Sequence, residues 1–219
     1  MMPPLYGLVL AGGKSRRMGR DKSALAYRQD ARGDGVPHAR YTADLLARVC
    51  EQVFVSCRAE QAGAAGAAQD PALAGLSLIP DAFDIGGPLN GILSAQQAHP
   101  GAAFLVAACD LPFLNAYALA QLVRERNPLH AATVFHNPVR DSLEPLCAIY
   151  EPGFLEISEP SMKIGLSCPT KILSALAEAR EIEVLEPASA EFLENANHPE
   201  DYERARAALS QASQGSTGL

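Results

Sequence analysis

Short apolar runs recur along the chain and are separated by longer segments in which apolar residues repeat at helical spacing. The first run, Leu5–Leu10, stops at a glycine pair, and we interpret it as a buried parallel strand that enters a tight turn. Later runs of the same kind cover residues 53–56, 76–80, 104–108, 131–135 and 145–150. Their lengths are those of ordinary strands.

Helices are predicted between these strands, over residues 41–51, 89–98 and 115–126, and again over 199–212. Residues 29–38 are charged and contain glycine and proline, so we expect a solvated loop there. An alanine- and glycine-rich stretch at 61–69 is expected to be a surface helix or loop, and the pattern weakens beyond residue 151. Strands that alternate with helices form βαβ units. The sequence therefore predicts an α/β fold with a mostly parallel sheet, in one domain over 1–212, with a disordered tail at 213–219.

The composition indicates a folded globular protein and excludes several classes of partner. Apolar residues make up 48% and charged residues 20% of the 219 positions, which is an ordinary balance. The net charge of −7 excludes a basic surface that would bind nucleic acid over its whole area. No apolar run approaches the ~20 residues of a membrane span, and Leu5–Ala11 is too short for a signal peptide. We therefore expect a cytoplasmic protein with no nucleic-acid partner and no membrane partner.

The cysteines and histidines show neither a disulfide pattern nor a metal-binding pattern. The five cysteines are odd in number and widely spaced, without a C-x-x-C pair, so a reducing compartment is expected. Cys109 and Cys147 are expected to be small buried apolar residues rather than nucleophiles. The five histidines, His38 among them, lack metal-ligand spacing and are expected at the surface.

The segment after the first strand combines a glycine turn with a high local positive charge. Gly12 and Gly13 carry no side chains, which lets backbone amides approach a ligand. Five basic residues follow within nine positions: Lys14, Arg16, Arg17, Arg20 and Lys22. This charge suits a triphosphate and a departing pyrophosphate, with a plain solvated loop as the alternative. The spacing is that of neither a Walker A motif nor a G-x-G-x-x-G turn, which disfavours P-loop kinases and dinucleotide-binding dehydrogenases.

Two acidic residues follow other strands of the predicted sheet. Asp110 comes two residues after the run 104–108, and Asp81 comes directly after the run 76–80. Ligands of open α/β sheets bind at the carboxyl ends of the strands, so we expect both side chains at the edge that carries the basic loop. Asp110 facing a triphosphate would suit Mg2+, which takes one or two carboxylates together with phosphate oxygens. The alternatives are an Asx turn at Asp110 and an ordinary turn at Asp81.

Several of these segments together resemble one family. Residues 10–22 (LAGGKSRRMGRDK) closely resemble the signature loop of the molybdenum cofactor guanylyltransferases, the MobA-like family of nucleotidyltransferases. The other matching segments follow in order: PD at 80–81, GPLNG at 87–91, CDLP at 109–112, EPLCAIY at 144–150 and NANHPED at 195–201. The resemblance covers about residues 5–205, and six matches in order are more specific than any one of them.

The resemblance implies a Rossmann-like, three-layer nucleotidyltransferase fold and a definite activity. Such an enzyme transfers GMP from GTP to the phosphate of molybdopterin, or of its molybdenum form, with Mg2+ and release of pyrophosphate. The acceptor phosphate would attack the α-phosphorus in line, without a covalent enzyme intermediate. Proteins of molybdenum cofactor biosynthesis and molybdoenzyme chaperones are further partners that the resemblance implies.

Carried over position by position, the resemblance also implies roles for single residues. The residues that would bind the nucleotide and its metal are Leu10, Ala11, Gly12, Gly13, Lys22, Ser56, Asp81 and Asp110. Lys22 would contact the phosphates, Asp81 the guanosine part, and Asp110 the Mg2+. Arg17 would steady the triphosphate, so that Arg17, Lys22 and Asp110 form the catalytic group.

Other positions concern the acceptor and depart in part from the family. Asn195 and Asn197 match a late Asn-x-Asn pattern near the metal and the pterin. Ser56 stands where the family often has Asn, and a serine can replace only some of the hydrogen bonds of an amide. Residues 156–171 match poorly, although acceptor contacts should lie in this late part of the chain. The acceptor is therefore the substrate that the sequence determines least.

Two other functions are compatible with the residues. One keeps the chemistry and changes the substrates, as in a cytidylyltransferase that acts on molybdopterin or on a sugar or polyol phosphate. Relatives that use CTP commonly show Ala-Ala-Gly where this chain has Ala11, Gly12 and Gly13, which favours GTP. The other is a nucleotide-binding module without catalysis, supported by the divergent segment 156–171.

Overall fold

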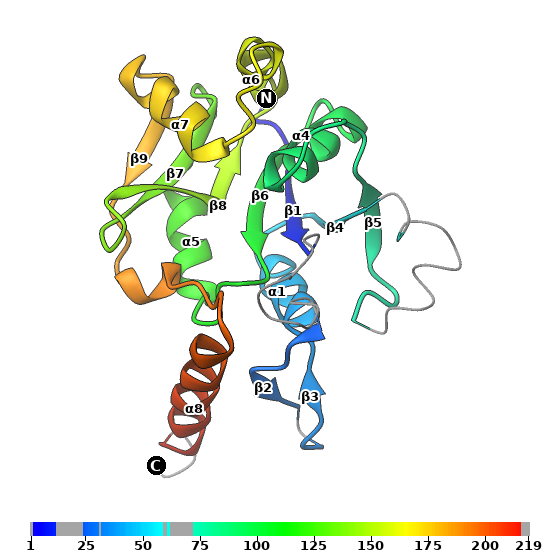
Figure 1. The fold of residues 1–219 in the computed structure, drawn as a ribbon, viewed down its shortest axis with the longest axis vertical. Helices are drawn as coiled ribbons and strands as arrows, with labels where there is room; N and C mark the ends of the chain where they lie inside the picture. The colour runs from blue at the N-terminus through cyan, green and yellow to red at the C-terminus, as the bar shows by residue number, and fades with distance from the viewer. Residues whose placement is uncertain (1, 12–23, 31, 59–60, 62–71, 216–219) are drawn as a thin grey trace.

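The structure is a computed structural model that describes residues 2–11, 24–30, 32–58, 61 and 72–215, with side chains as far as residue 211 (Figure 1). Within these ranges a seven-stranded sheet forms the centre of the molecule, and a two-stranded hairpin stands apart from it. The predicted basic loop lies outside the described residues, and so does most of the predicted helix or loop at 61–69.

The central sheet has the strand order β5-β4-β1-β6-β8-β7-β9. Its strands are β1 (Leu5–Leu10), β4 (Gln52–Cys57), β5 (Ser77–Pro80), β6 (Ala103–Ala108), β7 (Ala132–Asn137), β8 (Ser142–Tyr150) and β9 (Ile182–Leu185). β8 runs antiparallel to its neighbours β6 and β7, whereas the other neighbouring strands are parallel. The predicted α/β class and the mostly parallel sheet are therefore confirmed.

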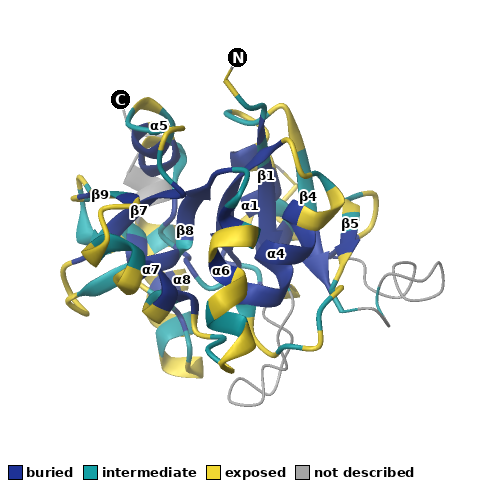
Figure 2. Cartoon of the chain, turned by 90° about the horizontal axis from the view of Figure 1, so that it is seen from above, coloured by how far each residue is buried: buried dark blue, intermediate teal, exposed yellow. Residues whose placement is uncertain are grey.

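Two helices, α1 (His38–Leu46) and α5 (Ala116–Arg124), cover one face of the sheet. The core on this face joins Val9 and Val55 of the strands to Leu46 of α1 and Leu119 of α5, all fully buried. Gly7 of β1 makes this packing close, because a Cβ atom there would lie 2.9 Å from the Cβ of Leu46. The dark blue sheet between partly exposed helices in Figure 2 shows this layering.

The opposite face of the sheet is covered by α4 (Pro88–Ala98), α6 (Phe154–Lys163) and α7 (Pro169–Glu178). A second core joins Phe104 of β6 to Ile92 of α4, Phe154 of α6 and Ile172 of α7. The chain therefore forms three layers. In the described part of the chain, no helix combines the length and the apolar character that crossing a bilayer would require.

The end of the chain packs against the segment that follows the basic loop. The helix α8 (Pro199–Gly215) comes after a 3-10 turn at Ala190–Leu193, and it is three residues longer than predicted. A third apolar cluster holds the two segments together: Leu25, Tyr27, Ala196 and Ala205, with Phe113, Tyr202 and Leu209 packed against them. Residues 216–219 of the predicted tail lie outside the described part.

The predicted solvated loop at 29–38 is in part a hairpin, made of β2 (Arg28–Gln29) and β3 (Gly35–Val36). Asp30 Oδ1 closes its turn by accepting hydrogen bonds from the backbone N–H groups of Arg32 (2.8 Å) and Asp34 (3.0 Å). The helix predicted at 41–51 begins at His38 instead and ends at Leu46. The prediction of a surface histidine is wrong at His38, which is 1% exposed.

Candidate functional site

The carboxyl ends of β1, β4, β5 and β6 lie at one edge of the sheet, as expected for parallel strands. The last residue of β1, Leu10, lies opposite Ser56 of β4 and Ala108 of β6. Ser56 in turn lies opposite Ile79 of β5. Residues that follow these strands therefore face the same region, which is where ligands of open α/β sheets bind.

Asp110 lies at this edge and is held there through its backbone. Its carbonyl oxygen accepts a hydrogen bond of 2.8 Å from the N–H of Ala196, between the two asparagines of the late Asn-x-Asn pattern. The preceding residue, Cys109, donates its N–H to the carbonyl oxygen of Leu10 (3.3 Å). Asp110 remains partly exposed, so the structure brings it together with the end of β1 and with residues 195–197.

Asp81 lies at the same edge but on another strand. Its N–H donates to the carbonyl oxygen of Cys57 (2.9 Å), which extends the pairing of β4 with β5 by one step. Asp81 and Asp110 are separated by three strand spacings, or about 14 Å along the edge. One metal ion cannot bind both carboxylates at that separation, so the two residues have room for the separate roles that the sequence predicts.

The loop after Asp81 is held by the side chain of Asn90 at the start of α4. The Asn90 amide donates to the carbonyl oxygens of Phe83 (2.6 Å) and Ile85 (2.9 Å), and its oxygen accepts from the N–H of Phe83 (3.2 Å). The hydroxyl of Ser94, one turn later, accepts from the N–H of Ala82 (2.8 Å). Sequence reasoning missed this network, for which an asparagine directly after a Gly-Gly-Pro-Leu break is the available signal.

Ser56 is 4% exposed and lies under α4. A Cβ atom on Gly91 of α4 would lie 2.3 Å from the Ser56 hydroxyl oxygen, so the helix packs directly on the end of β4. A nucleotide contact through Ser56 would need a ligand to reach this enclosed hydroxyl. That role stays a prediction, as do the roles of Leu10, which is 8% exposed, and Ala11, which is partly exposed.

Arg28 in the hairpin and His38 just after it form hydrogen bonds with the backbone that follows Asp110. The Arg28 guanidinium donates to the carbonyl oxygen of Pro112 (3.0 Å) and lies 3.8 Å from the centre of the Tyr41 ring. The His38 ring also stacks on Tyr41, with ring centres 5.5 Å apart, and its Nε2 lies 3.2 Å from the carbonyl oxygen of Leu111. Sequence reasoning missed both residues, because their partners lie more than 70 positions away.

Burial lowers the pKa of His38 to about 4, with smaller effects from the hydrogen bond to Leu111 and from the charge of Arg28. The ring is therefore neutral near pH 7. Because Nε2 faces a carbonyl oxygen, that nitrogen must carry the ring proton and donate it. His38 thus contributes a neutral hydrogen bond that fixes the segment after Asp110.

A third carboxylate, Glu144, lies near the start of β8, which runs in the opposite direction and so begins at this edge. Glu144 is 1% exposed and forms an ion pair with Arg140. It also accepts hydrogen bonds from the Asn137 amide (3.3 Å) and the N–H of Leu146 (3.1 Å). Burial raises its pKa, Arg140 and these donors oppose the rise, and the charge of Asp110 adds to it.

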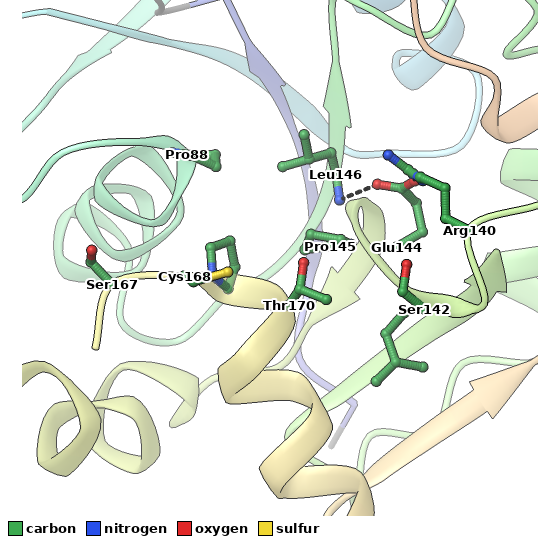
Figure 3. Close-up of a pocket in the computed structure, with 11 residues that line it drawn as sticks. Pro88, Arg140, Ser142, Glu144, Pro145, Leu146, Ser167, Cys168 and Thr170 are labelled. Atoms are coloured by element: carbon green, nitrogen blue, oxygen red, sulfur yellow. Dashed lines mark hydrogen bonds and ion pairs between the residues drawn. The ribbon is translucent and has the colours of Figure 1, made fainter.

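Two cavities adjoin Arg140. The first, of about 360 Å³, lies between the start of α4, the start of β8 and the start of α7, with Pro88 and Thr170 among its lining residues. Figure 3 shows the side chains from α7 facing those of β8 and Arg140 across it. The second, of about 280 Å³, is lined by Arg140 together with Asn195 and Asn197. Asn195 and Asn197 of the second cavity flank Ala196, whose N–H bonds to Asp110, so the late part of the chain places a cavity next to this contact.

The donor set at the edge suits magnesium held jointly by protein and phosphate. In the described ranges, no group of three or more histidine, cysteine or acidic side chains could hold a metal ion by itself. Asp110 is a partly exposed residue and offers one carboxylate, and Mg2+ commonly takes one or two carboxylates and completes its shell with phosphate oxygens and water. The four predicted residues Gly12, Gly13, Arg17 and Lys22 lie outside the described part, so their roles stay predictions.

Comparison with known families gives a match over most of the chain. The family described as the MobA-like NTP transferase domain matches residues 7–164. This range contains the predicted basic loop, the three strand-end residues Ser56, Asp81 and Asp110, and the start of β8.

Relatives with assigned names cover nearly the whole chain. The "Molybdenum cofactor biosynthesis bifunctional protein" of Synechocystis is 39% identical over 199 residues, which are 91% of this chain and 53% of that protein. This chain therefore spans about half the length of that relative. A protein of Opitutus terrae named "Probable molybdenum cofactor guanylyltransferase" is 32% identical over 207 residues, covering 92% of this chain and 95% of its own.

Solved structures share the fold at lower identity. A protein of Archaeoglobus fulgidus described as molybdopterin-guanine dinucleotide biosynthesis protein A superposes with a TM-score of 0.71 at 23% identity, over 94% of this chain and 99% of its own. A nucleotidyl transferase of Methanothermobacter superposes with a TM-score of 0.70 at 19% identity, over 95% and 99% of the two chains. The predicted three-layer nucleotidyltransferase fold is therefore confirmed.

Proposed function

The chain belongs to the family of MobA-like NTP transferases, and from this membership we propose that it transfers GMP from GTP to the phosphate of molybdopterin or its molybdenum form. The products would be the guanine dinucleotide and pyrophosphate. The names of the relatives from Synechocystis and Opitutus support the choice of pathway and of nucleotide. The observation that carries the proposal is the position of Asp110, partly exposed beside the end of β1 and bonded to Ala196.

The nucleotide would lie along the carboxyl edge of the sheet. Asp81 would receive the guanosine end, and Leu10, Ala11, Gly12 and Gly13 would hold the nucleotide in the turn after β1. The separation of about 14 Å between Asp81 and Asp110 supports an extended ligand that touches both. Ser56, enclosed under α4, would act on the nucleotide from the floor of this path.

The reaction needs positioning and charge neutralisation rather than a nucleophilic side chain. Mg2+ at Asp110 would neutralise phosphate charge when bound. Lys22 and Arg17 would contribute the remaining positive charge to the triphosphate and to the departing pyrophosphate. Cys109 and Cys147 are 3% and 0% exposed, and burial raises the pKa of Cys147, which supports a structural role for both.

The acceptor would enter from the late part of the chain. The cavities on either side of Arg140 adjoin Asn195, Asn197 and the start of α7, where acceptor contacts are expected. Proteins that hand over or receive the cofactor would be further partners. We propose that one domain over residues 1–212 carries out the reaction. We propose the cytoplasm as its compartment, where the five cysteines would remain thiols.

The test is a measurement of pyrophosphate release with molybdopterin as acceptor and with GTP or CTP as donor. We expect turnover with GTP and little with CTP. Turnover with CTP alone would replace the proposal by a cytidylyltransferase. Nucleotide binding without any transfer to molybdopterin would replace it by a binding module.

A further inference from the structure

Tyr27 is a buried tyrosine that neither the sequence motifs nor the proposed chemistry uses. It lies four residues after position 23, the last of the residues 12–23 that the structure does not describe. It directly precedes β2. The residue is 3% exposed. Its ring packs against His38 at 4.8 Å and Tyr202 at 5.0 Å, and it belongs to the third apolar cluster.

The hydroxyl oxygen of Tyr27 is buried and has no hydrogen-bond partner within the described part of the chain. A buried hydroxyl without a partner is unfavourable, because it has lost its bonds to water and gained none. Phenylalanine would fill the same space in the cluster without that cost. The hydroxyl is therefore unexplained by packing, and it is a candidate for a contact that forms only when a ligand is bound.

The neighbourhood of Tyr27 leads directly to Asp110. Ala196 packs in the same apolar cluster as Tyr27, and the N–H of Ala196 donates to the Asp110 carbonyl oxygen at 2.8 Å. The next residue after Tyr27, Arg28, donates to the carbonyl oxygen of Pro112, two positions beyond Asp110. Tyr27 therefore lies next to two of the contacts that anchor the segment of Asp110.

The protonation state of Tyr27 fixes the direction of the hydrogen bond. Burial is the largest cause that raises the pKa of Tyr27, and the negative charge of Asp110 is the next. The hydroxyl therefore stays protonated at neutral pH, so it can donate to a carboxylate. Hydrogen bonds of active sites are often long in the unliganded state and tighten when the substrate binds.

We propose that Tyr27 is a positioning residue for Asp110: its hydroxyl donates to the Asp110 carboxylate when the cation and the nucleotide are bound. This inference rests on the proposed function. One carboxylate oxygen would then accept from Tyr27 while the other faces the cation, which fixes the orientation of the group. Residues that orient a metal ligand in this way commonly change metal affinity by 10- to 100-fold when they are removed.

The test compares the full-length protein with its Tyr27→Phe variant in binding Mn2+ together with GTP. Manganese replaces magnesium as the probe, because the free ion gives an electron paramagnetic resonance signal that disappears on binding. We expect the variant to bind Mn2+ about 10-fold or more weakly in the presence of GTP. We also expect its melting temperature to stay the same or to rise, since an unsatisfied buried hydroxyl is removed. Equal Mn2+ affinity in the two proteins would overturn the inference.

Tyr202→Phe is the matched control, because Tyr202 belongs to the same cluster but has a structural hydrogen bond. Its hydroxyl donates to the carbonyl oxygen of Ala26 at 3.0 Å. We expect this variant to melt at a lower temperature and to keep its Mn2+ affinity. An equal loss of Mn2+ affinity in both variants would show that packing is responsible and would overturn the positioning role.

The same titration separates this inference from the function on which it rests. A wild-type protein that binds no Mn2+ in the presence of GTP would overturn both. A wild-type protein that binds Mn2+ and GTP, with an unchanged Tyr27→Phe variant, would overturn the role of Tyr27 alone.

Discussion

The strand end that carries Asp110 and the strand start that carries Glu144 are neighbours in the sheet, yet they are built in opposite ways. Around Asp110 the backbone is anchored, because its carbonyl oxygens accept hydrogen bonds from Ala196, Arg28 and His38. At Glu144 it is the side chain that is anchored, as three protein groups bond to a carboxylate that is 1% exposed.

This difference separates two uses of an acidic residue. A carboxylate whose bonds are taken up by an ion pair and two donors holds the protein together. An acidic residue that is partly exposed and is positioned by backbone hydrogen bonds can bind a ligand while those bonds stay in place. We therefore expect changes at Asp110 to affect turnover and changes at Glu144 to affect stability.

The largest effect is expected from Asp110→Asn. Loss of the carboxylate charge should lower pyrophosphate release on the order of 1000-fold, because a bound metal contributes several kcal/mol of charge stabilisation. The free energy of unfolding should change little, since the substitution keeps the backbone hydrogen bonds at Asp110, Leu111 and Pro112. Kinetics and chemical denaturation measure the two quantities.

The control for this variant is Asp44→Asn, on the exposed side of α1. It removes the same charge from an exposed position of a helix, and both quantities should stay unchanged. An Asp110→Asn protein that unfolds easily but turns over normally would reverse the comparison between the two carboxylates.

The second prediction concerns the hydrogen bond from His38 to the carbonyl oxygen of Leu111, next to Asp110. The pH dependence of stability tests it. The pKa of His38 is lowered from 6.5 to about 4 in the folded state, so between these values the unfolded chain binds the proton and the folded chain does not. Stability should therefore fall by about 3 kcal/mol as the pH drops from 6.5 to 4. Denaturation at several pH values measures this loss.

His38→Gln sharpens this prediction, because a glutamine amide can still donate to Leu111 but does not titrate. Its stability should change less between pH 6.5 and 4 than that of the wild type. An identical pH dependence in the two proteins would remove His38 from this explanation.

Glu144→Gln tests the other side of the comparison. The glutamine amide leaves Arg140 without its charge partner, and its N–H groups face the N–H donors of Arg140 and Asn137. The free energy of unfolding should therefore fall by about 2 kcal/mol. Binding of Mn2+ and GTP should be unaffected, because the substitution leaves Asp110 and its backbone contacts in place. A variant of wild-type stability that no longer binds nucleotide would contradict the structural role.

The smallest effect is expected on stability, at the contact between α4 and Ser56 of β4. Gly91→Ala would place a Cβ atom 2.3 Å from the Ser56 hydroxyl oxygen, and overpacking of this kind costs about 1–3 kcal/mol of stability. Gly101→Ala is the control, since its Cβ atom would meet nothing within 4 Å. Thermal denaturation of the two variants should differ, and equal melting temperatures would show that α4 can move away.

The sequence predicts the sheet well where the signal is local. The apolar runs that become β1, β4, β5 and β6 are strands of the central sheet, and their order along the chain requires crossover helices that the periodicity also predicts. Asp110 follows from the same logic, because a charged residue just after an apolar strand must meet solvent or a partner. Its position at the edge needs no information from distant residues.

Other features depend on contacts that periodicity does not reveal. Helix α6 contains Pro160, and a proline inside a helix disfavours a helix prediction, so this element is missing from the predicted set. His38 looks like a loop residue because its apolar surroundings, Tyr27 and Tyr41, and its acceptor Leu111 are brought by the fold. Arg140 and Glu144 are four residues apart in the sequence, but only the structure shows that the glutamate is buried.

The hydrogen bond between Ala196 and Asp110 bears on how the chain can be shortened. The matched family region ends at residue 164, whereas the wall behind Asp110 is completed by a segment that begins some thirty positions later. A protein cut back to the shared region would retain every signature motif up to β8 and still lack the support of its central acid. A comparison of relatives confined to residues 7–164 would for the same reason leave out the residue that supports Asp110 from behind.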